Sequence, residues 1–247
     1  MKISIITPNY NDLRIKKTLD SIYAQTYKDI EVIVVDGLSS KPQVLEIYKQ
    51  YPLDILIHEK DKGIFDALNK GINRASGDII FLIGSDDYIR DDNTFESVVS
   101  TFKKDNTLDG VCIGCELIDD NGKIVRKWYE ENISSSKMKW GILPPHFSLF
   151  LKKELYELTG RFQIDYSKNL ALDAIWLLKL ATLKNVKIYS LSQHTTMMGH
   201  GGTSTGSYRN ILKAMVITSK GARDLGIKGW LFFPFIKVIR KIPQFFS

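Results

Sequence analysis

An apolar segment that ends at two adjacent carboxylates has the clearest chemical potential in the chain. Ile79–Ile83 contains no polar residue, which predicts a strand buried on both faces within a parallel sheet. It is followed by Gly84, Ser85, Asp86 and Asp87. Ligands of open α/β sheets bind beyond the carboxyl ends of the strands, and carboxylates bind hard divalent cations. The stretch alone is equally consistent with a loop whose aspartates form turns and cap helices.

Acidic residues also follow two earlier segments that are predicted as strands. Asp36 comes directly after residues 30–35, and Asp61, with Lys62 beside it, follows residues 53–58. Each of these acids taken alone is explained as well by a turn or a solvated charge cluster. Because the carboxyl ends of parallel strands meet at one edge of a sheet, a shared ligand site is the more economical explanation.

Three further residues could carry chemistry. Asp173 lies among apolar residues, where an unpaired charge is costly to bury, so it is a candidate general base. A helix N-cap would also explain it. His146 and His200 lie beside turn residues, where a lone histidine is usually a surface residue. Cys112 and Cys115 have Cys-x-x-Cys spacing, but a strand would place them on opposite faces, which disfavours a zinc or redox site.

Alternating strands and helices are expected to position these residues. Strands are predicted at residues 2–8, 30–35, 53–58 and 79–83, with helices between them at residues 13–26, 42–52 and 64–75. Asn11 or Asp12 is the expected N-cap of the first helix. Three strand–helix alternations before the fourth strand predict a doubly wound parallel sheet. No glycine-rich fingerprint follows the first strand, which argues against an ordinary dinucleotide-binding fold.

The pattern is less regular after residue 87. A helix is predicted at residues 95–102, and two strands, 111–118 and 123–128, are joined by a turn with the hairpin pair Asn121–Gly122. The polar, serine-rich segment 130–141 is predicted as a loop that can move. Further along we expect an apolar run, a short helix, a buried helix, a strand and a flexible loop, at residues 147–151, 152–160, 172–183, 186–191 and 200–204.

Composition is ordinary for a soluble globular protein, with 44% hydrophobic and 25% charged residues in a chain of 247. We expect no secretory signal and no membrane-spanning segment, because no apolar stretch approaches ~20 residues. Two cysteines suit a reducing compartment. The net charge of +6, from 34 basic and 28 acidic residues, suits an anionic partner such as phosphates, nucleic acid or an acidic membrane surface.

The segment 229–246 combines aromatic and basic residues. One helical face would contain Phe232, Phe235, Ile236, Ile239 and Ile242, and the opposite face Lys237 and Lys241. This pattern predicts an amphipathic segment that lies on an anionic membrane leaflet. Docking onto the protein's own core or onto a dimer partner is the alternative.

Together these segments resemble the family 2 glycosyltransferases of the GT-A fold, in particular the bacterial enzymes that build lipopolysaccharide, O-antigen, capsule and exopolysaccharide. The likeness covers residues 1–205. Its blocks are Ile3–Asn11, Val34–Gly37, Glu59–Gly71, Gly77–Asp78, Phe81–Asp87, Pro145–His146, Gly160–Phe162, Asp173 and Gly201–Ser204, and Asp61–Gly71 is the most specific part. The resemblance implies an α/β GT-A fold with a Rossmann-like, mostly parallel sheet flanked by helices. Its nucleotide-sugar half would be residues 1–115, its acceptor half 116–205, and a helical, amphipathic, membrane-associating extension 206–247.

The resemblance also implies roles for single residues. Asp173 would be the catalytic base, and Asp87 would bind Mg²⁺ or Mn²⁺. The residues around the nucleotide sugar would be Thr7, Pro8, Tyr10, Asp36, Asp61, Lys62, Asp66, Asn69, Lys70, Ser85 and Asp86. Those on the acceptor and diphosphate side would be His146, Trp176, His200 and Ser204. Two departures from the family pattern are Ser85, where many relatives carry a further acid, and the missing second aspartate after Asp36–Gly37; the first lowers the expected metal affinity.

The expected function is metal-dependent, inverting transfer of a sugar from a nucleotide-diphosphate donor, UDP-sugar first, to a lipid-linked (polyprenyl-diphosphate) oligosaccharide during surface polysaccharide synthesis. The enzyme would be cytoplasmic and peripheral on the anionic inner membrane, with no nucleic-acid partner. The alternatives are a sugar nucleotidyltransferase and a catalytically silent sugar-nucleotide or membrane-binding scaffold. Nucleotidyltransferases usually carry a glycine-rich basic loop after the first strand, unlike Asn9–Asp12, and intact Asp87 and Asp173 argue against the scaffold.

Overall fold

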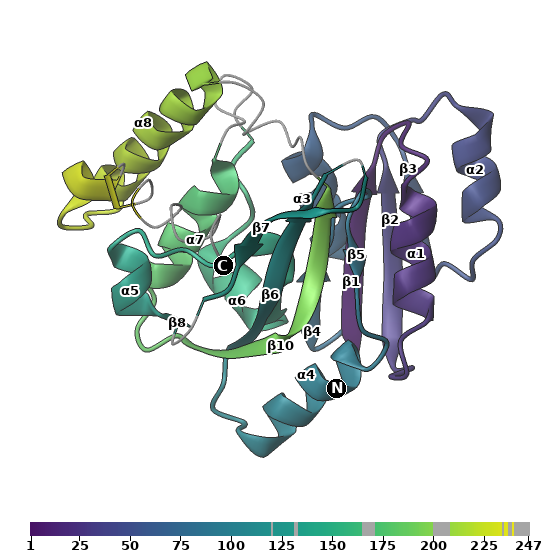
Figure 1. Cartoon of the computed structure of the whole chain (residues 1–247), viewed down its shortest axis with the longest axis horizontal. Coiled ribbons are helices and arrows are strands. Elements are labelled where there is room, and N and C mark those ends of the chain that lie inside the picture. Colours follow the sequence, from purple (N-terminus) through teal and green to yellow (C-terminus); the bar gives the residue numbers. More distant parts are fainter. Residues whose placement is uncertain are drawn as a thin grey trace.

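A mixed sheet of ten strands forms the centre of the part of the chain that the computed structural model describes (Figure 1). This part consists of residues 1–119, 121–130, 133–164, 171–199, 208–233, 235, 236 and 239. One half of the sheet is entirely parallel, in the order β3-β2-β1-β4. Its strands are β1 (Ile3–Asn9), β2 (Ile30–Asp36), β3 (Ile55–His58) and β4 (Ile79–Leu82).

The other half of the sheet begins at β9 (Leu149–Lys152), which runs antiparallel to β4 and to β6 (Gly110–Ile118). The strand β10 (Lys187–Gly199) is parallel to β6, and β5 (Tyr88–Ile89) is antiparallel to β10. Two short additions, β7 (Ile124–Trp128) on β6 and β8 (Ile133–Ser134) on β10, complete it. The pairings give β1 to β4, β6 and β10 one common direction, so the described sheet is mostly parallel.

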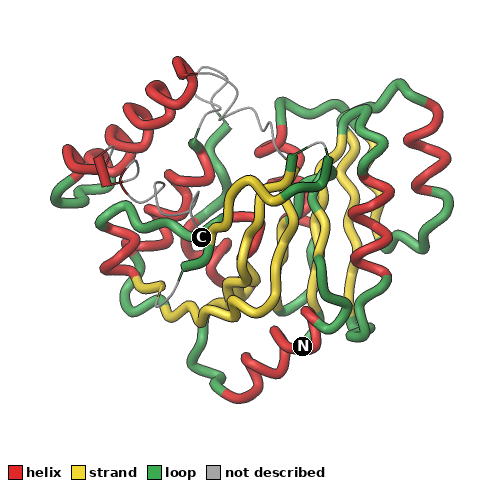
Figure 2. Tube along the Cα trace, viewed as in Figure 1, coloured by secondary structure: helices red, strands yellow, loops and turns green. Residues whose placement is uncertain are grey.

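Helices cover both faces of the sheet (Figure 2). All four residues of β4 are buried, and successive side chains point to opposite faces. Phe81 belongs to the layer that contains α1 (Ile15–Tyr23), α2 (Pro42–Tyr48) and α4 (Thr94–Lys104). Leu82 belongs to the other layer, with α3 (Ile64–Arg74), α6 (Lys153–Thr159) and α7 (Leu172–Thr182). The α/β fold class is as the sequence predicted.

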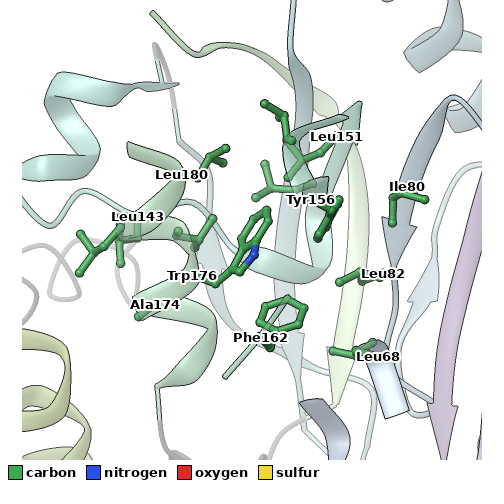
Figure 3. Packing of buried hydrophobic residues seen from close by; sticks show 14 of the residues in the cluster. Leu68, Ile80, Leu82, Leu143, Leu151, Tyr156, Phe162, Ala174, Trp176 and Leu180 are labelled. Atoms are coloured by element: carbon green, nitrogen blue, oxygen red, sulfur yellow. The ribbon is translucent and has the colours of Figure 1, made fainter. Parts of the chain in front are cut away.

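A buried tryptophan connects α7 to the rest of its layer. Trp176 stacks on Tyr156 of α6 at a centroid distance of 4.6 Å and lies 5.5 Å from the ring of Phe162. Its Nε1 donates a hydrogen bond to the carbonyl of Gly160 at 2.8 Å. In Figure 3 the rings of Tyr156 and Phe162 lie on the side of the indole that faces Ile80 and Leu82 of the sheet. This packing fixes the amino end of α7, and therefore Asp173, relative to the sheet.

The carboxyl-terminal part of the described chain is helical. The helix α8 (Tyr208–Asp224) packs on α7, because a Cβ on Gly221 would lie 2.9 Å from Ile175. The short helix η3 (Trp230–Phe232) follows it. In Figure 1, α8 and α2 lie at opposite ends of the molecule. Lys237 and Lys241 lie outside the described residues. Among the described residues, no helix is long and apolar enough to span a bilayer.

Several predicted elements differ from those observed. The segment 130–141 is wrong as a loop, because it contains β8 and the helix α5 (Ser135–Lys139), whose N-cap Ser134 accepts a hydrogen bond from the amide of Lys137. The first helix is not capped by Asn11 or Asp12; its N-cap position is Arg14. The last strand continues past residue 191 to Gly199 through a bulge. Pairing with sheet neighbours, which local sequence does not reveal, stabilises these extra segments.

Candidate functional site

The loop after β4 holds two carboxylates in different surroundings. The side chain of Asp86 is 33% exposed, whereas Asp87 is only 3% exposed. The two carboxylate oxygens of Asp87 accept hydrogen bonds from the amides of Gly199 and Gly84, each at 3.3 Å. The pKa of Asp87 is raised to about 8, chiefly by burial and then by the charge of Asp86, against the opposing effects of these two amides and of Arg14.

Neighbouring elements fix this loop. The hydroxyl of Thr18, a buried residue of α1, lies 2.6 Å from the carbonyl oxygen of Asp87 and 3.0 Å from that of Ser85. A Cβ on Gly84 would lie 2.7 Å from Oδ2 of Asp87, and one on Gly199 would lie 2.9 Å from Oδ2 of Asp86. The two glycines are therefore required for the carboxylates to lie as they do.

The donor set fits a divalent cation that a ligand would help to coordinate. Asp87 offers a buried carboxylate that, within the described part of the chain, is held by two long hydrogen bonds, and Asp86 lies next to it. Within the described residues, no group of three or more His, Cys, Asp or Glu side chains encloses a metal site. Mg²⁺ commonly binds through one or two carboxylates and completes its shell with substrate phosphates and water.

A second cluster surrounds Gly37 at the carboxyl ends of β1, β2 and β3. A Cβ on Gly37 would collide with the carboxylate of Asp61 and lie 3.5 Å from the ring of Tyr10. The Tyr10 ring is exposed, and Oδ1 of Asp61 accepts the amide of Gly63 at 2.8 Å. An aromatic face and a carboxylate beside bare backbone can accommodate a planar base and a polyol. In β1, the buried Oγ1 of Thr7 finds no partner among the described atoms.

Asp36 has a different environment although it ends the neighbouring strand β2. It is fully buried, and its carboxylate accepts the amide and the hydroxyl of Ser39, each at 2.6 Å. The hydroxyl of Tyr48 donates a further bond at 2.6 Å, and Nδ1 of His58 lies at 2.8 Å. These contacts join β2, α2 and β3, so in this conformation Asp36 supports the cluster around Gly37 from beneath.

The residues of the loop 59–63 and of α3 are engaged with the chain itself. Oδ2 of Asp66 accepts the amide of Lys62 at 2.9 Å, and Nζ of Lys70 lies 2.9 Å from Glu59. Asn69 exchanges two hydrogen bonds with the backbone of Phe162, at 2.8 and 2.9 Å. This block therefore shapes its own loop and connects α3 with the segment that leads to α7.

A buried histidine lies between the two halves of the sheet. His146 begins the short helix η1 (His146–Ser148), and its ring is 5.3 Å from Phe162 and 5.8 Å from Trp176, centroid to centroid. Neither ring nitrogen has a hydrogen-bond partner among the described atoms. Burial lowers the pKa of His146 to about 4, although the charge of Asp173 acts in the opposite direction. The imidazole is therefore neutral near pH 7 and has one donor and one acceptor to offer a ligand.

Asp173 is not a helix cap. It is the second residue of α7, and the N-cap position is Ala171, which has a left-handed backbone with φ of 66°. The charge of Asp173 acts on the pKa of His146, so Asp173 lies near the imidazole. Trp176 is buried and serves packing. His200 and Ser204 lie outside the described residues.

The family model described as "Glycosyl transferase family 2" matches residues 4–159, more than half of the chain. The chain belongs to glycosyl transferase family 2. The predictions of the family and of the glycosyltransferase class are confirmed.

Curated relatives of this family 2 glycosyltransferase agree with the assignment. An uncharacterized glycosyltransferase of Bacillus subtilis is 38% identical over 174 residues, which cover 67% of this chain and 63% of the relative. One of Nostoc sp. is 28% identical over 171 residues, covering 64% and 52%. Chondroitin synthase of Escherichia coli is 27% identical over 239 residues, covering 94% and 34%. The chain thus spans between 34% and 63% of the length of these relatives.

Solved structures support the GT-A fold. TarS of S. aureus, residues 1–349 in complex with UDP-GlcNAc, has a TM-score of 0.68 at 22% identity, covering 90% of this chain and 66% of that one. A mannosyltransferase of Pyrobaculum calidifontis, in complex with GDP-Man and Mn²⁺, has a TM-score of 0.61 at 21% identity, covering 96% and 64%. At these identities the likeness concerns the fold, and it agrees with the fold class predicted from the sequence.

The sequence prediction missed residues that organise the site. Arg14 contacts Asp86, Thr18 holds the acidic loop, and Tyr48 and His58 hold Asp36. A positional signal existed for the first two, because they follow β1 at the edge of the sheet where the acids gather. Nothing local identifies Tyr48 or His58, which meet Asp36 only through tertiary packing.

Proposed function

We propose that the protein transfers a sugar from a nucleoside-diphosphate donor, UDP-sugar first, to an acceptor hydroxyl with inversion at the anomeric carbon. The observation that carries this proposal is the contrast within the carboxyl edge of the sheet. Asp87 is buried and, among the residues that the structure describes, has no cationic side chain in hydrogen-bonding contact, while the exposed ring of Tyr10 and the carboxylate of Asp61 lie beside the backbone of Gly37. Because the chain belongs to glycosyl transferase family 2, glycosyl transfer is the reaction that we assign to these residues.

The donor would lie across residues 1–115. Its base and ribose would occupy the cluster of Tyr10, Gly37 and Asp61, supported by Asp36. Its diphosphate would lie at Asp86 and Asp87, where Mg²⁺ or Mn²⁺ bound to Asp87 would neutralise the leaving group and orient it. Gly84 and Gly199 leave room for this arrangement, since a side chain at either position would collide with a carboxylate.

The acceptor would approach through residues 116–205. Asp173 takes the proton of the acceptor hydroxyl as the oxygen attacks the anomeric carbon, and the bond from that carbon to the diphosphate oxygen breaks. One displacement inverts the configuration and needs no covalent intermediate. The neutral His146 beside Asp173 would hydrogen-bond a sugar hydroxyl without forming an ion pair that would weaken the base.

The carboxyl-terminal surface supports a proposal about the acceptor class and the location. Exposed apolar side chains gather there, namely Leu212, Val216, Leu231, Phe232, Phe235 and Ile239, and Lys213, Lys220, Arg223 and Lys228 are exposed nearby in the sequence. Aromatic and basic residues together favour an anionic bilayer surface. We therefore propose peripheral binding to the cytoplasmic face of the inner membrane and a polyprenyl-diphosphate-linked saccharide acceptor in surface polysaccharide synthesis.

Turnover tests the reaction. UDP-, GDP- and dTDP-sugars are first compared by thermal shift with Mn²⁺, because a ligand that binds the folded state raises the melting temperature. The best donor is then incubated with lipid-linked saccharides, and release of nucleoside diphosphate is measured. Wild type should turn over, and Asp173→Asn should bind the donor yet lose about 10³-fold or more in kcat. Equal turnover by both proteins contradicts the role of Asp173, and donor binding without turnover by wild type favours a silent scaffold.

Membrane binding is tested on the full-length chain. Phe232 and Phe235 are 60% and 68% exposed, and Leu158 of α6, which is 68% exposed, provides a matched control. Substitution of both phenylalanines by serine should reduce co-sedimentation with anionic vesicles, whereas Leu158→Ser should not. Equal sedimentation of the two variants would contradict the proposed membrane surface.

A further inference from the structure

The guanidinium of Arg14 lies beside the acidic loop of Asp86 and Asp87 and has no role in the mechanism described above. Nη1 of Arg14 is 3.4 Å from Oδ2 of Asp86, and the charges of both Asp86 and Asp87 raise the pKa of Arg14, after the larger effect of its hydrogen bond to Asp12. A Cβ on Gly199 would lie 3.6 Å from the same Nη1. Arg14 therefore lies where β10 ends and the diphosphate of a donor is expected.

Asp12 orients this guanidinium. Its carboxylate accepts Nε of Arg14 at 3.0 and 3.1 Å and Nη2 at 2.6 Å, which occupies one edge of the planar group. Oδ1 of Asp12 also accepts the backbone amide of Arg14 at 2.9 Å. The Nη1 edge is left directed toward Asp86 and the end of β10. The side chain of Arg14 is nevertheless 61% exposed, so its contact with Asp86 is one that solvent and ligands can reach.

We propose that Arg14 is a diphosphate-binding residue of the donor site. On donor binding the Nη1 edge exchanges Asp86 for a phosphate oxygen, while Asp12 keeps the rest of the guanidinium in place. This inference rests on the proposed function and deepens it, since it assigns a second positive charge to the leaving group besides the divalent cation.

The charges of the loop explain why a second cation is useful. A nucleoside diphosphate brings several negative charges next to Asp86 and Asp87, and one divalent ion does not balance them all. Arginine stays protonated and forms directional hydrogen bonds with phosphate oxygens. An exposed ion pair such as Arg14–Asp86 adds little to stability, so exchanging one partner for another meets little resistance.

A structural role makes different predictions. If Arg14 only braced Asp86, its removal would loosen the loop and weaken every ligand of the site, nucleosides included. If Arg14 blocked the site by neutralising Asp86, its removal would strengthen nucleotide binding. A phosphate-binding role predicts a loss confined to ligands that carry the diphosphate.

The test is calorimetric titration of the full chain with UDP, GDP and dTDP, and with the matching nucleosides, with and without Mn²⁺. Arg14→Gln should weaken the preferred nucleoside diphosphate about 10- to 100-fold, as expected for a lost charged hydrogen bond. The loss should persist without Mn²⁺, and nucleoside affinity should stay unchanged. Arg14→Lys should recover part of the affinity. Arg74→Gln, at the far end of α3, is the surface control, and melting temperatures report folding.

Two results would overturn the proposal. One is unchanged or tighter diphosphate binding by Arg14→Gln, and the other is an equal loss for the nucleoside and the diphosphate. A wild-type protein that binds none of the three diphosphates would overturn the proposed function, and this inference with it. The two failures are therefore distinguishable.

Discussion

The central sheet has a buried carboxylate at its amino edge and another at its carboxyl edge, that is, at the two ends of its parallel strands. The surroundings of the two carboxylates differ. At the amino edge, Glu31 of β2 is 5% exposed and accepts hydrogen bonds from the hydroxyls of Ser4 and Ser76 and from the amide of Ser76, at 2.5 to 2.8 Å. At the carboxyl edge, Asp87 is 3% exposed and accepts hydrogen bonds from two amides of the described residues, both at 3.3 Å, beside a second carboxylate. The exposed fractions are thus similar, whereas Asp87 lies deeper in the protein and has fewer hydrogen-bond donors around it than Glu31.

The pKa values follow this difference. Burial, the largest single effect on Glu31, raises its pKa, but the hydrogen bonds from Ser4 and Ser76 and the charge of Lys2 together lower it to about 2. For Asp87 burial prevails, and the pKa rises to about 8. A buried acid whose lone pairs are filled stabilises the fold, whereas one left short of donors has binding capacity for a ligand. The comparison separates a structural edge from a functional edge within one sheet.

The strongest test is the same conservative change on both edges. Asp87→Asn should lower kcat by about 10³-fold or more, because an amide binds a divalent cation poorly at the leaving diphosphate. The free energy of unfolding without metal should stay equal or increase, since the substitution removes an acid that must either take up a proton or bury its charge in the folded state. Steady-state kinetics with Mn²⁺ and urea titration without it measure the two effects. Loss of stability together with activity would show that Asp87 is a structural acid after all.

Glu31→Gln should give the opposite pattern, with nearly unchanged kcat and a loss of about 3 kcal/mol at pH 7. The folded pKa of Glu31 lies below its ordinary value of 4.5, at about 2. Its stabilisation is therefore fully present above pH 4.5 and is lost as the pH falls from about 4.5 toward 2. Urea titrations across this range should show a smaller pH slope for Glu31→Gln than for wild type. Equal pH slopes for the two proteins would contradict the interpretation that the hydrogen bonds to Glu31 stabilise the fold.

The sequence was sufficient for the parallel half of the sheet and for the edge at which the acids gather. Apolar runs such as Ile79–Ile83 predicted buried strands, and the chain connectivity placed Asp36, Asp61, Asp86 and Asp87 at their carboxyl ends. The resemblance to a family added candidate roles. The half after residue 87 was less predictable, because β8 and β9 are short strands whose identity depends on partners distant in sequence.

The sequence could not tell which acids are free for a ligand. Asp36 and Asp87 both lie at the carboxyl ends of parallel strands, β2 and β4, yet the carboxylate of Asp36 is held by Ser39, Tyr48 and His58. The donors come from other elements and meet the acid only in the folded state. Whether a carboxylate binds substrate or stabilises the fold therefore depends on tertiary contacts, and it cannot be predicted from composition or spacing.

Thr18→Val tests whether the functional edge needs its supporting contact. The hydroxyl that lies 2.6 Å from the carbonyl of Asp87 is lost, and valine preserves the shape of the side chain. The buried carbonyl would lose its donor at a cost of about 1–2 kcal/mol in stability. We expect kcat to fall by about 10-fold with little change in the binding of a nucleoside. A loss of stability with unchanged kcat would place Thr18 with the structural acids.

The smallest expected effect concerns Asp36, which lies at the functional edge but is filled like Glu31. Tyr48→Phe removes one of its donors, the hydroxyl at 2.6 Å, without altering the surface around Gly37. Because Ser39 and His58 still hold the carboxylate, we expect a loss of only about 1 kcal/mol in stability and a change of less than about 3-fold in kcat. Urea titration and donor kinetics measure both. A large rise in the KM of the donor with unchanged stability would mean that Asp36 contacts the nucleotide directly. In that case, the edge of the sheet at which an acid lies, and not the number of its hydrogen bonds, would decide whether it binds a ligand or stabilises the fold.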